Sequence, residues 1–170
     1  IIRTSWLYAP FGKNFYTTMC AKIKENANVK VTSTQTGTPT HALDLASWLF
    51  KVMSQESKAY GVYHLTNAGH CTWYDFAKTI FENHSLADLK KLQNTTNYPT
   101  FAQRPKYSVL DCKKAINTWQ IEPMHWQERL LKQRIPLHYR LISFRIVNVF
   151  RLLMQLLKNM ANNRSIGHFR

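Results

Sequence analysis

Cysteine is scarce in this sequence, and the three cysteines that occur, Cys20, Cys71 and Cys112, lie far apart. None belongs to a Cys-x-x-Cys pair, and an odd number cannot pair completely within one chain. A disulfide framework and a cysteine-based zinc site are therefore disfavoured, and reduced thiols are the simpler interpretation. We accordingly predict a cytoplasmic protein.

Acidic residues are also scarce. The chain has 23 lysines and arginines but only 9 aspartates and glutamates, which gives a formal net charge of +14. Up to Glu128 there are 14 basic residues and all 9 acidic ones, whereas the 42 residues from Arg129 onward hold 9 basic residues and no acidic one. Most of the positive charge therefore belongs to the C-terminal tail. Because zinc-finger spacing and Gly-aromatic RNA motifs are missing too, we predict no nucleic-acid partner.

The sequence also lacks a self-sufficient set of catalytic or metal-binding groups. No pair of carboxylates is spaced like a glycosidase dyad, and no serine lies in a Gly-x-Ser-x-Gly turn. We therefore predict no catalytic residue and no metal site within these 170 residues. Four histidines without metal-ligand spacing are predicted to be surface or packing residues: His41, His64, His70 and His84.

What the chain does have is enough apolar sequence for a packed core. Apolar residues make up 45% and aromatic residues 13%, values typical of a globular domain. Short strand patterns alternate with helical periodicity, which predicts an α/β fold with a parallel or mixed sheet, because parallel neighbours need crossover connections. We expect strands at 1–5, 29–32 and 61–66, the first of them buried, and helices at 14–26, 41–55, 73–83, before 119, and at 124–133.

Two of these helices have N-terminal capping signals. Thr40 precedes the helix at 41–55, and Thr72 with Asp75 forms a capping-box pattern before the helix at 73–83. The apolar stripe of the latter helix is interpreted as core. The segment between this helix and residue 100 is predicted to be a loop with one helical turn.

Residues 132–170 form a second predicted segment, a basic apolar helical tail of unknown role. Between residues 137 and 160 it is rich in Leu, Ile, Val, Phe and Met. A membrane-spanning helix would bury Arg145 and Arg151 at a cost of about 2.5–3.5 kcal/mol each, so we predict no transmembrane segment. An interfacial helix that contacts a membrane surface or a partner stays open, and so does a fusion end or altered reading frame.

The opening of the chain carries the most specific motif. An apolar start runs into RTSWLY at residues 3–8 and then GKNFYTTM at residues 12–19. In an α/β protein, the loop at the end of a strand is where ligands bind. Four further blocks follow in order: TQTGTPT at 34–40, YHLTNAG at 63–69, TWYDFA at 72–77 and RPKYSVLD at 104–111.

Together these blocks resemble dTDP-4-dehydrorhamnose reductases, members of the extended short-chain dehydrogenase/reductase superfamily. The resemblance covers residues 1–131 and implies the C-terminal part of a Rossmann-like fold, with a small sugar-nucleotide-binding subdomain. Ala9 stands where the family usually has Gly, and Thr34 where it usually has Asp. The family's Gly-rich phosphate loop and Tyr-x-x-x-Lys pair lie upstream of the part that matches, so we expect no reductase activity from these 170 residues alone.

Arg104 is the first candidate for a substrate contact. Its guanidinium is always charged and forked, which suits a diphosphate, and Pro105 restricts Arg104 to an extended conformation. The resemblance places Trp6 beside the sugar ring. It also places Thr4 and Ser5 near the nicotinamide, as cofactor-binding residues.

Two more residues are predicted to bind substrate. Gln35 lies in a loop where Gly37 permits the backbone to approach a ligand closely. Asn14 stands at a helix start, where its amide can cap the helix, bind a ligand, or do both.

The resemblance implies an enzyme that passes a hydride from NADPH or NADH to C4 of dTDP-4-dehydro-rhamnose, the last step toward dTDP-rhamnose for cell-surface polysaccharide. Its implied partner is the sugar nucleotide, and a homodimer is left open. The alternative is a non-enzymatic regulatory or binding subunit of the same fold, similar to those of methionine adenosyltransferase. The intact Ser-Trp block favours the enzyme. A third interpretation is a membrane-associated or structural fragment dominated by the tail.

Overall fold

The computed structural model of the protein describes residues 1–55, 58–96 and 104–133. Residues 1–133 belong to one structural unit. The predicted tail lies outside the described residues from position 134 onward, so its helix and its contacts stay predictions. No helix in the described part is long and apolar enough to cross a membrane.

The strands are short and pair two by two within the described residues. Three pairs are parallel, β1 with β6, β2 with β5 and β3 with β8, whereas β4 and β7 are antiparallel. This mixed α/β arrangement is the predicted fold class. The strands are β1 (Ile2–Arg3), β2 (Leu7–Tyr8), β3 (Val29–Thr32), β4 (Thr36–Gly37), β5 (Thr40–His41), β6 (Tyr63–His64), β7 (Cys71–Thr72) and β8 (Leu92–Thr95).

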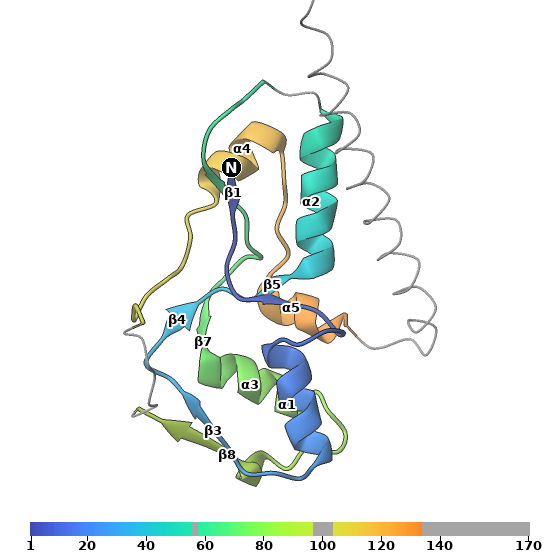
Figure 1. Ribbon diagram of the computed structural model, residues 1–170, viewed down its shortest axis with the longest axis vertical. Helices are drawn as coiled ribbons and strands as arrows, with labels where there is room; N and C mark the ends of the chain where they lie inside the picture. The colour runs from blue at the N-terminus through green and yellow to red at the C-terminus, as the bar shows by residue number, and fades with distance from the viewer. Residues whose placement is uncertain (56–57, 97–103, 134–170) are drawn as a thin grey trace, which may run out of the picture. The chain divides into compact units, whose positions relative to one another are not determined.

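The helices connect these strands and cover them. Helix α4 packs against β6, and Figure 1 shows α1 beside α3 near the β3–β8 pair. The helices are α1 (Phe15–Lys24), α2 (Ala42–Ser54), α3 (Trp73–Glu82), α4 (Lys113–Trp119) and α5 (Trp126–Leu131), with a 3₁₀ turn η1 (Leu89–Lys91).

Two apolar clusters hold the fold together. The larger gathers side chains of α1, α3, α5, β3 and β8 around Phe76, which is completely buried. The smaller lies between α2, β6 and α4, around Leu65 and Trp119. A completely buried Phe side chain stabilises the fold by about 1.5–3 kcal/mol relative to an exposed one.

The two clearest predicted helices begin at their expected caps. Asn14 Oδ1 accepts a hydrogen bond from the Thr17 backbone N–H at 3.1 Å, and α1 starts at the next residue. At α3, Thr72 Oγ1 accepts from Asp75 N at 3.1 Å while the Asp75 carboxylate accepts from Thr72 N at 3.0 Å. This reciprocal pair is the predicted capping box.

Three local predictions are wrong. The first strand is shorter than residues 1–5 and is not buried, since Ile1 is 81% exposed. The cap of α2 is His41, whose Nδ1 accepts from Leu43 N at 3.2 Å, because α2 begins at Ala42 and Thr40 lies one residue too early. The predicted loop at 85–100 contains β8, which sequence patterns miss because pairing with β3 creates it and only Leu92 of its residues is buried.

Candidate functional site

A cavity of about 550 Å³ lies where four of the sequence blocks meet. Its size falls within the range of small-molecule sites. The cavity brings together four of the six predicted site residues, which are spread over about 100 positions of the chain: Ser5, Trp6, Gln35 and Arg104. Its lining residues are Ser5, Trp6, Gln35, Trp73, Arg104, Pro105 and Ser108.

Backbone pairing with β4 brings the Arg104 segment to the cavity. The Thr36 backbone N–H donates to the Lys106 carbonyl at 2.8 Å, and Ser108 N donates to the Thr36 carbonyl at 2.9 Å. Ser108 Oγ donates to the same carbonyl at 3.1 Å. Because Gln35 immediately precedes Thr36, these bonds place Arg104 and Gln35 at one wall. The Arg104 side chain is exposed, so its charge is available to a ligand.

Trp6 lies between β1 and β2 and forms an aromatic wall of the cavity. Its indole stacks on Trp73, with ring centroids 3.6 Å apart and planes 12° apart. The ring also covers Gly37, so the space above this glycine is filled by Trp6. The prediction that Gly37 leaves room for a ligand is therefore corrected: it leaves room for the tryptophan.

The two predicted cofactor residues have different surroundings. Ser5 lines the cavity, and its Oγ donates to the Thr38 carbonyl at 3.0 Å. Thr4 does not line it, and its buried Oγ1 has no hydrogen-bond partner in the described part of the chain. Whether either residue contacts a nicotinamide stays a prediction.

Asn14 is not among the residues that line the cavity. Besides capping α1, its Nδ2 donates to the carbonyls of Ala9 and Phe11, each at 3.0 Å. The amide thus ties the loop after β2 to the helix start, which is the capping role that the sequence predicted. A ligand contact of Asn14 stays a prediction.

Sequence reasoning missed Trp73 and Ser108 as cavity residues. Trp73 was interpreted as part of the core stripe of α3, yet it is the first residue of that helix and only half-buried. Its place directly after the predicted cap residue Thr72 was the available signal. Ser108 had no such signal, because only its pairing with Thr36 brings it to the cavity.

Comparison with known proteins shows the family of the chain. Residues 1–135 match the family model described as the RmlD substrate binding domain. The chain belongs to this family. It is 40% identical over 130 residues to the spore coat polysaccharide biosynthesis protein SpsK of Bacillus subtilis, covering 76% of this chain and 44% of that protein. It is also 38% identical over 142 residues to the dTDP-4-dehydrorhamnose reductase of Aggregatibacter actinomycetemcomitans. This match covers 76% of this chain and 48% of that protein.

Solved RmlD-family structures agree with this assignment. The dTDP-4-dehydrorhamnose reductase of Bacillus anthracis, crystallised with NADP, matches with a TM-score of 0.64 at 34% identity, over 77% of this chain and 45% of that one. The family and fold predicted from the five sequence blocks are therefore confirmed, as is NAD(P) binding within the family. The chain spans about half the length of the curated relatives it matches.

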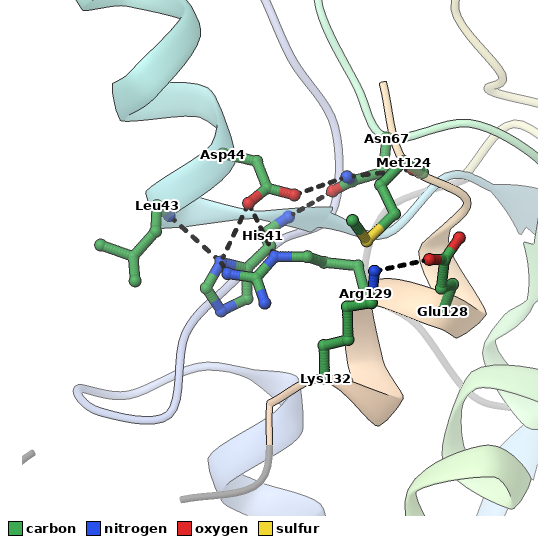
Figure 2. Close-up of polar contacts among 8 residues, drawn as sticks. All are labelled: His41, Leu43, Asp44, Asn67, Met124, Glu128, Arg129 and Lys132. Carbon is green, nitrogen blue, oxygen red and sulfur yellow. Dashed lines mark hydrogen bonds and ion pairs between the residues drawn. The ribbon is translucent and has the colours of Figure 1, made fainter. Parts of the chain in front are cut away.

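A second polar cluster in this RmlD-family chain lies where β5, α2 and α5 meet, outside the cavity (Figure 2). Arg129 Nε donates to Asp44 Oδ1 at 2.7 Å, and Arg129 Nη2 lies 2.9 Å from His41 Nδ1. Asn67 Nδ2 donates to Asp44 Oδ2 at 2.8 Å, while Asn67 Oδ1 accepts from His41 N at 2.8 Å. These bonds join three elements and the loop after β6.

His41 and Asn67 are the buried members of this cluster, and His41 is a packing residue as the sequence predicted. Its Nδ1 receives both the Leu43 N–H and the Arg129 guanidinium, which fixes the neutral ring with its proton on Nε2. Burial, and next the positive charge of Arg129, lower the pKa of His41 from 6.5 to about 4, although Asp44 acts in the opposite direction.

We expect His41 to make the fold less stable in acid. Between pH 6.5 and about 4 the unfolded chain binds a proton that the folded chain excludes, so the unfolding free energy falls as the pH is lowered. The His41 ring accounts for a fall of about 3 kcal/mol in the unfolding free energy, and this fall is nearly complete at pH 4.

Urea unfolding measured at several pH values tests this expectation. His41→Asn is the matched control. The asparagine side chain does not titrate, but its amide oxygen can still accept the hydrogen bond from Leu43 N–H. The stability of this variant should vary less between pH 6.5 and 4 than that of the unaltered chain. Parallel profiles for the two proteins would contradict the role of His41.

Proposed function

We propose that this chain is the sugar-nucleotide-binding part of a dTDP-4-dehydrorhamnose reductase, which reduces the C4 keto group of dTDP-4-dehydro-rhamnose with NAD(P)H. The observation that carries the proposal is the cavity itself, where Trp6, Gln35 and Arg104 meet from three separate sequence blocks. The free thiols of Cys20, Cys71 and Cys112 support a cytoplasmic location for this reaction.

The cavity contains the chemistry that a sugar nucleotide requires. Arg104 offers a forked cation for a diphosphate, and two parallel charge-assisted hydrogen bonds to phosphate oxygens are stronger than neutral ones. Gln35 can both donate to and accept from sugar hydroxyls. Trp6 supplies a flat apolar surface for the C–H face of a sugar ring.

The residues of this chain fit the nicotinamide cofactor only in part. Thr4 has a buried hydroxyl without a partner in the described residues, and Ser5 places a second hydroxyl at the cavity edge. NAD(P)H supplies the hydride of the proposed reaction. The 170 residues contain no Gly-rich phosphate loop. Their Tyr-x-x-x-Lys spacing, Tyr74 and Lys78, lies on α3, and neither residue lines the cavity. The role that we propose for this chain is therefore to bind and orient the sugar nucleotide.

Titration calorimetry of the 170-residue chain tests the proposal. We expect dTDP-rhamnose, the product of the proposed reaction, to bind at one site, and dTDP to bind there more weakly because it lacks the sugar. Free rhamnose, which lacks the diphosphate that Arg104 would hold, should bind more weakly than either. A chain that binds neither nucleotide would overturn the proposal.

A second measurement separates the enzyme from the non-enzymatic alternative. The complete protein that contains this sequence is incubated with dTDP-4-dehydro-rhamnose and NADPH, and the absorbance of the reduced nicotinamide is followed. We expect it to decline with time. Binding of dTDP-rhamnose without this decline would favour a binding subunit.

A further inference from the structure

Trp6 adopts a backbone conformation that most residues avoid. Its φ is +43°, in the left-handed region where a Cβ crowds the backbone. Such conformations persist only where the surrounding structure determines them strongly, and they cluster at ligand sites. The contacts of Trp6 therefore show what holds it in place.

Trp73 provides the first of these contacts. The two indole rings lie nearly parallel, with centroids 3.6 Å apart. Phe15 backs Trp73 with a centroid distance of 4.6 Å, and Phe15 in turn stacks on the fully buried Phe76 at 5.5 Å. The aromatic stack thus runs without interruption from the core to the cavity wall.

Gly37 provides the second contact. A Cβ at this position would lie 2.4 Å from a ring carbon of Trp6, closer than real Cβ contacts come, so glycine is required for the indole to lie there. Gly37 pairs with Cys71 in β7, and the neighbouring Thr36 pairs with Thr72. Because Thr72 precedes Trp73, one strand pair fixes both residues that confine Trp6.

The position of Trp73 is fixed a second time by the cap of α3. Thr72 Oγ1 donates to Asp75 Oδ2 at 2.6 Å, and Asp75 N donates back to Thr72 Oγ1 at 3.1 Å. Trp73 is the first residue of this ten-residue helix. Its backbone therefore has little freedom, and the indole it presents is a firm support for Trp6.

We infer that Trp73 is a positioning residue for the sugar end of the cavity, acting through Trp6 by holding that indole in its left-handed conformation. The inference deepens the proposed function and rests on it. Because Trp6 is the predicted contact of the sugar ring and Arg104 that of the diphosphate, Trp73 controls affinity for the sugar and leaves affinity for the diphosphate nearly unchanged. A general collapse of the cavity would weaken both.

Calorimetry with two probes separates these effects. For Trp73→Ala we expect the dissociation constant of dTDP-rhamnose to rise about tenfold and that of dTDP by less than about twofold. Trp73→Phe keeps an aromatic face under Trp6 and should stay within about threefold of the unaltered chain for both ligands. Trp48→Phe, in the smaller apolar cluster, is the control and should change neither. Equal weakening of both ligands by Trp73→Ala would overturn the inference.

A spectroscopic measurement tests the positioning without any ligand. Ring protons of Trp6 should resonate upfield in the NMR spectrum of the unaltered chain, because Trp73 lies against its face. Gly37→Ala, whose added methyl group must displace the indole, should move these signals downfield while Trp73 is intact.

Calorimetry and NMR together distinguish a failure of the proposed function from a failure of the positioning role of Trp73. If the unaltered chain binds neither dTDP-rhamnose nor dTDP, the proposed function is wrong, and the Trp6 signals still decide the positioning. If the Trp6 signals are the same in the unaltered chain, Gly37→Ala and Trp73→Ala, then Trp6 is not held by its neighbours and the inference is wrong, whatever the chain binds.

Discussion

Replacement of Asp44 by alanine is expected to lower the free energy of unfolding by about 2–4 kcal/mol. Asp44 is paired with Arg129 at 2.7 Å, and the two side chains are only 19% and 16% exposed. Removing the carboxylate takes away the counter-ion of Arg129 and the acceptor of its Nε. The guanidinium then keeps only the neutral His41 Nδ1, and Asn67 Nδ2 keeps only the Met124 carbonyl at 3.2 Å. A buried charge without its counter-ion costs more than the pair itself contributes.

Glu128→Ala is the matched control for this variant. Glu128 pairs with Lys132, also at 2.7 Å, but these side chains are 55% and 56% exposed (Figure 2). Water screens such a pair, so its removal should cost less than about 0.5 kcal/mol. Urea denaturation at pH 7 measures both variants. Equal losses would show that the Asp44 cluster does not join α2 to α5 as the contacts indicate.

Replacement of Arg104 by alanine is expected to raise the dissociation constant of dTDP by about tenfold to a hundredfold, the loss of a charge-assisted bond to phosphate. The side chain lines the cavity and is exposed, so its removal should leave the fold intact. The backbone bonds between this segment and β4 do not involve the Arg104 side chain. Calorimetry gives the affinity, and circular dichroism checks the fold.

Lys106→Ala controls for a general loss of positive charge. Lys106 lies two residues further along and is also exposed, but it does not line the cavity. Its carbonyl accepts from Thr36 N, a bond that alanine preserves. We expect less than about a twofold change in dTDP affinity. A comparable loss in both variants would mean that charge in this region, and not the placement of Arg104, governs binding.

Local sequence signals predicted the parts of the fold that local chemistry determines. The start of α1 at Asn14 and the capping box of Thr72 and Asp75 depend on residues three positions apart. The buried stripe of α3 follows helical periodicity through Phe76 and Ile80. Motif resemblance then supplied the family, because the order of five blocks is specific even where single contacts are not.

Long-range pairing explains what the sequence could not show. Arg104 lies near Gln35 because the backbone of Lys106 and Ser108 forms hydrogen bonds with Thr36. No local sequence pattern predicts this long-range pairing. Strand β8 exists for the same reason, through its pairing with β3. The His41 cluster was missed because its members come from β5, α2, α5 and a loop, and each alone is an ordinary polar residue.

The most direct test of the sugar-nucleotide site uses the five tryptophans as reporters. Their indole N–H signals are assigned by single substitutions, and dTDP-rhamnose is titrated into the 170-residue chain. Trp6 and Trp73 line the cavity, whereas Trp48 and Trp119 lie in the smaller apolar cluster. We predict saturable shifts of the Trp6 and Trp73 signals, with those of Trp48 and Trp119 unchanged. Binding that leaves the Trp6 and Trp73 signals where they were would contradict the assignment of this cavity.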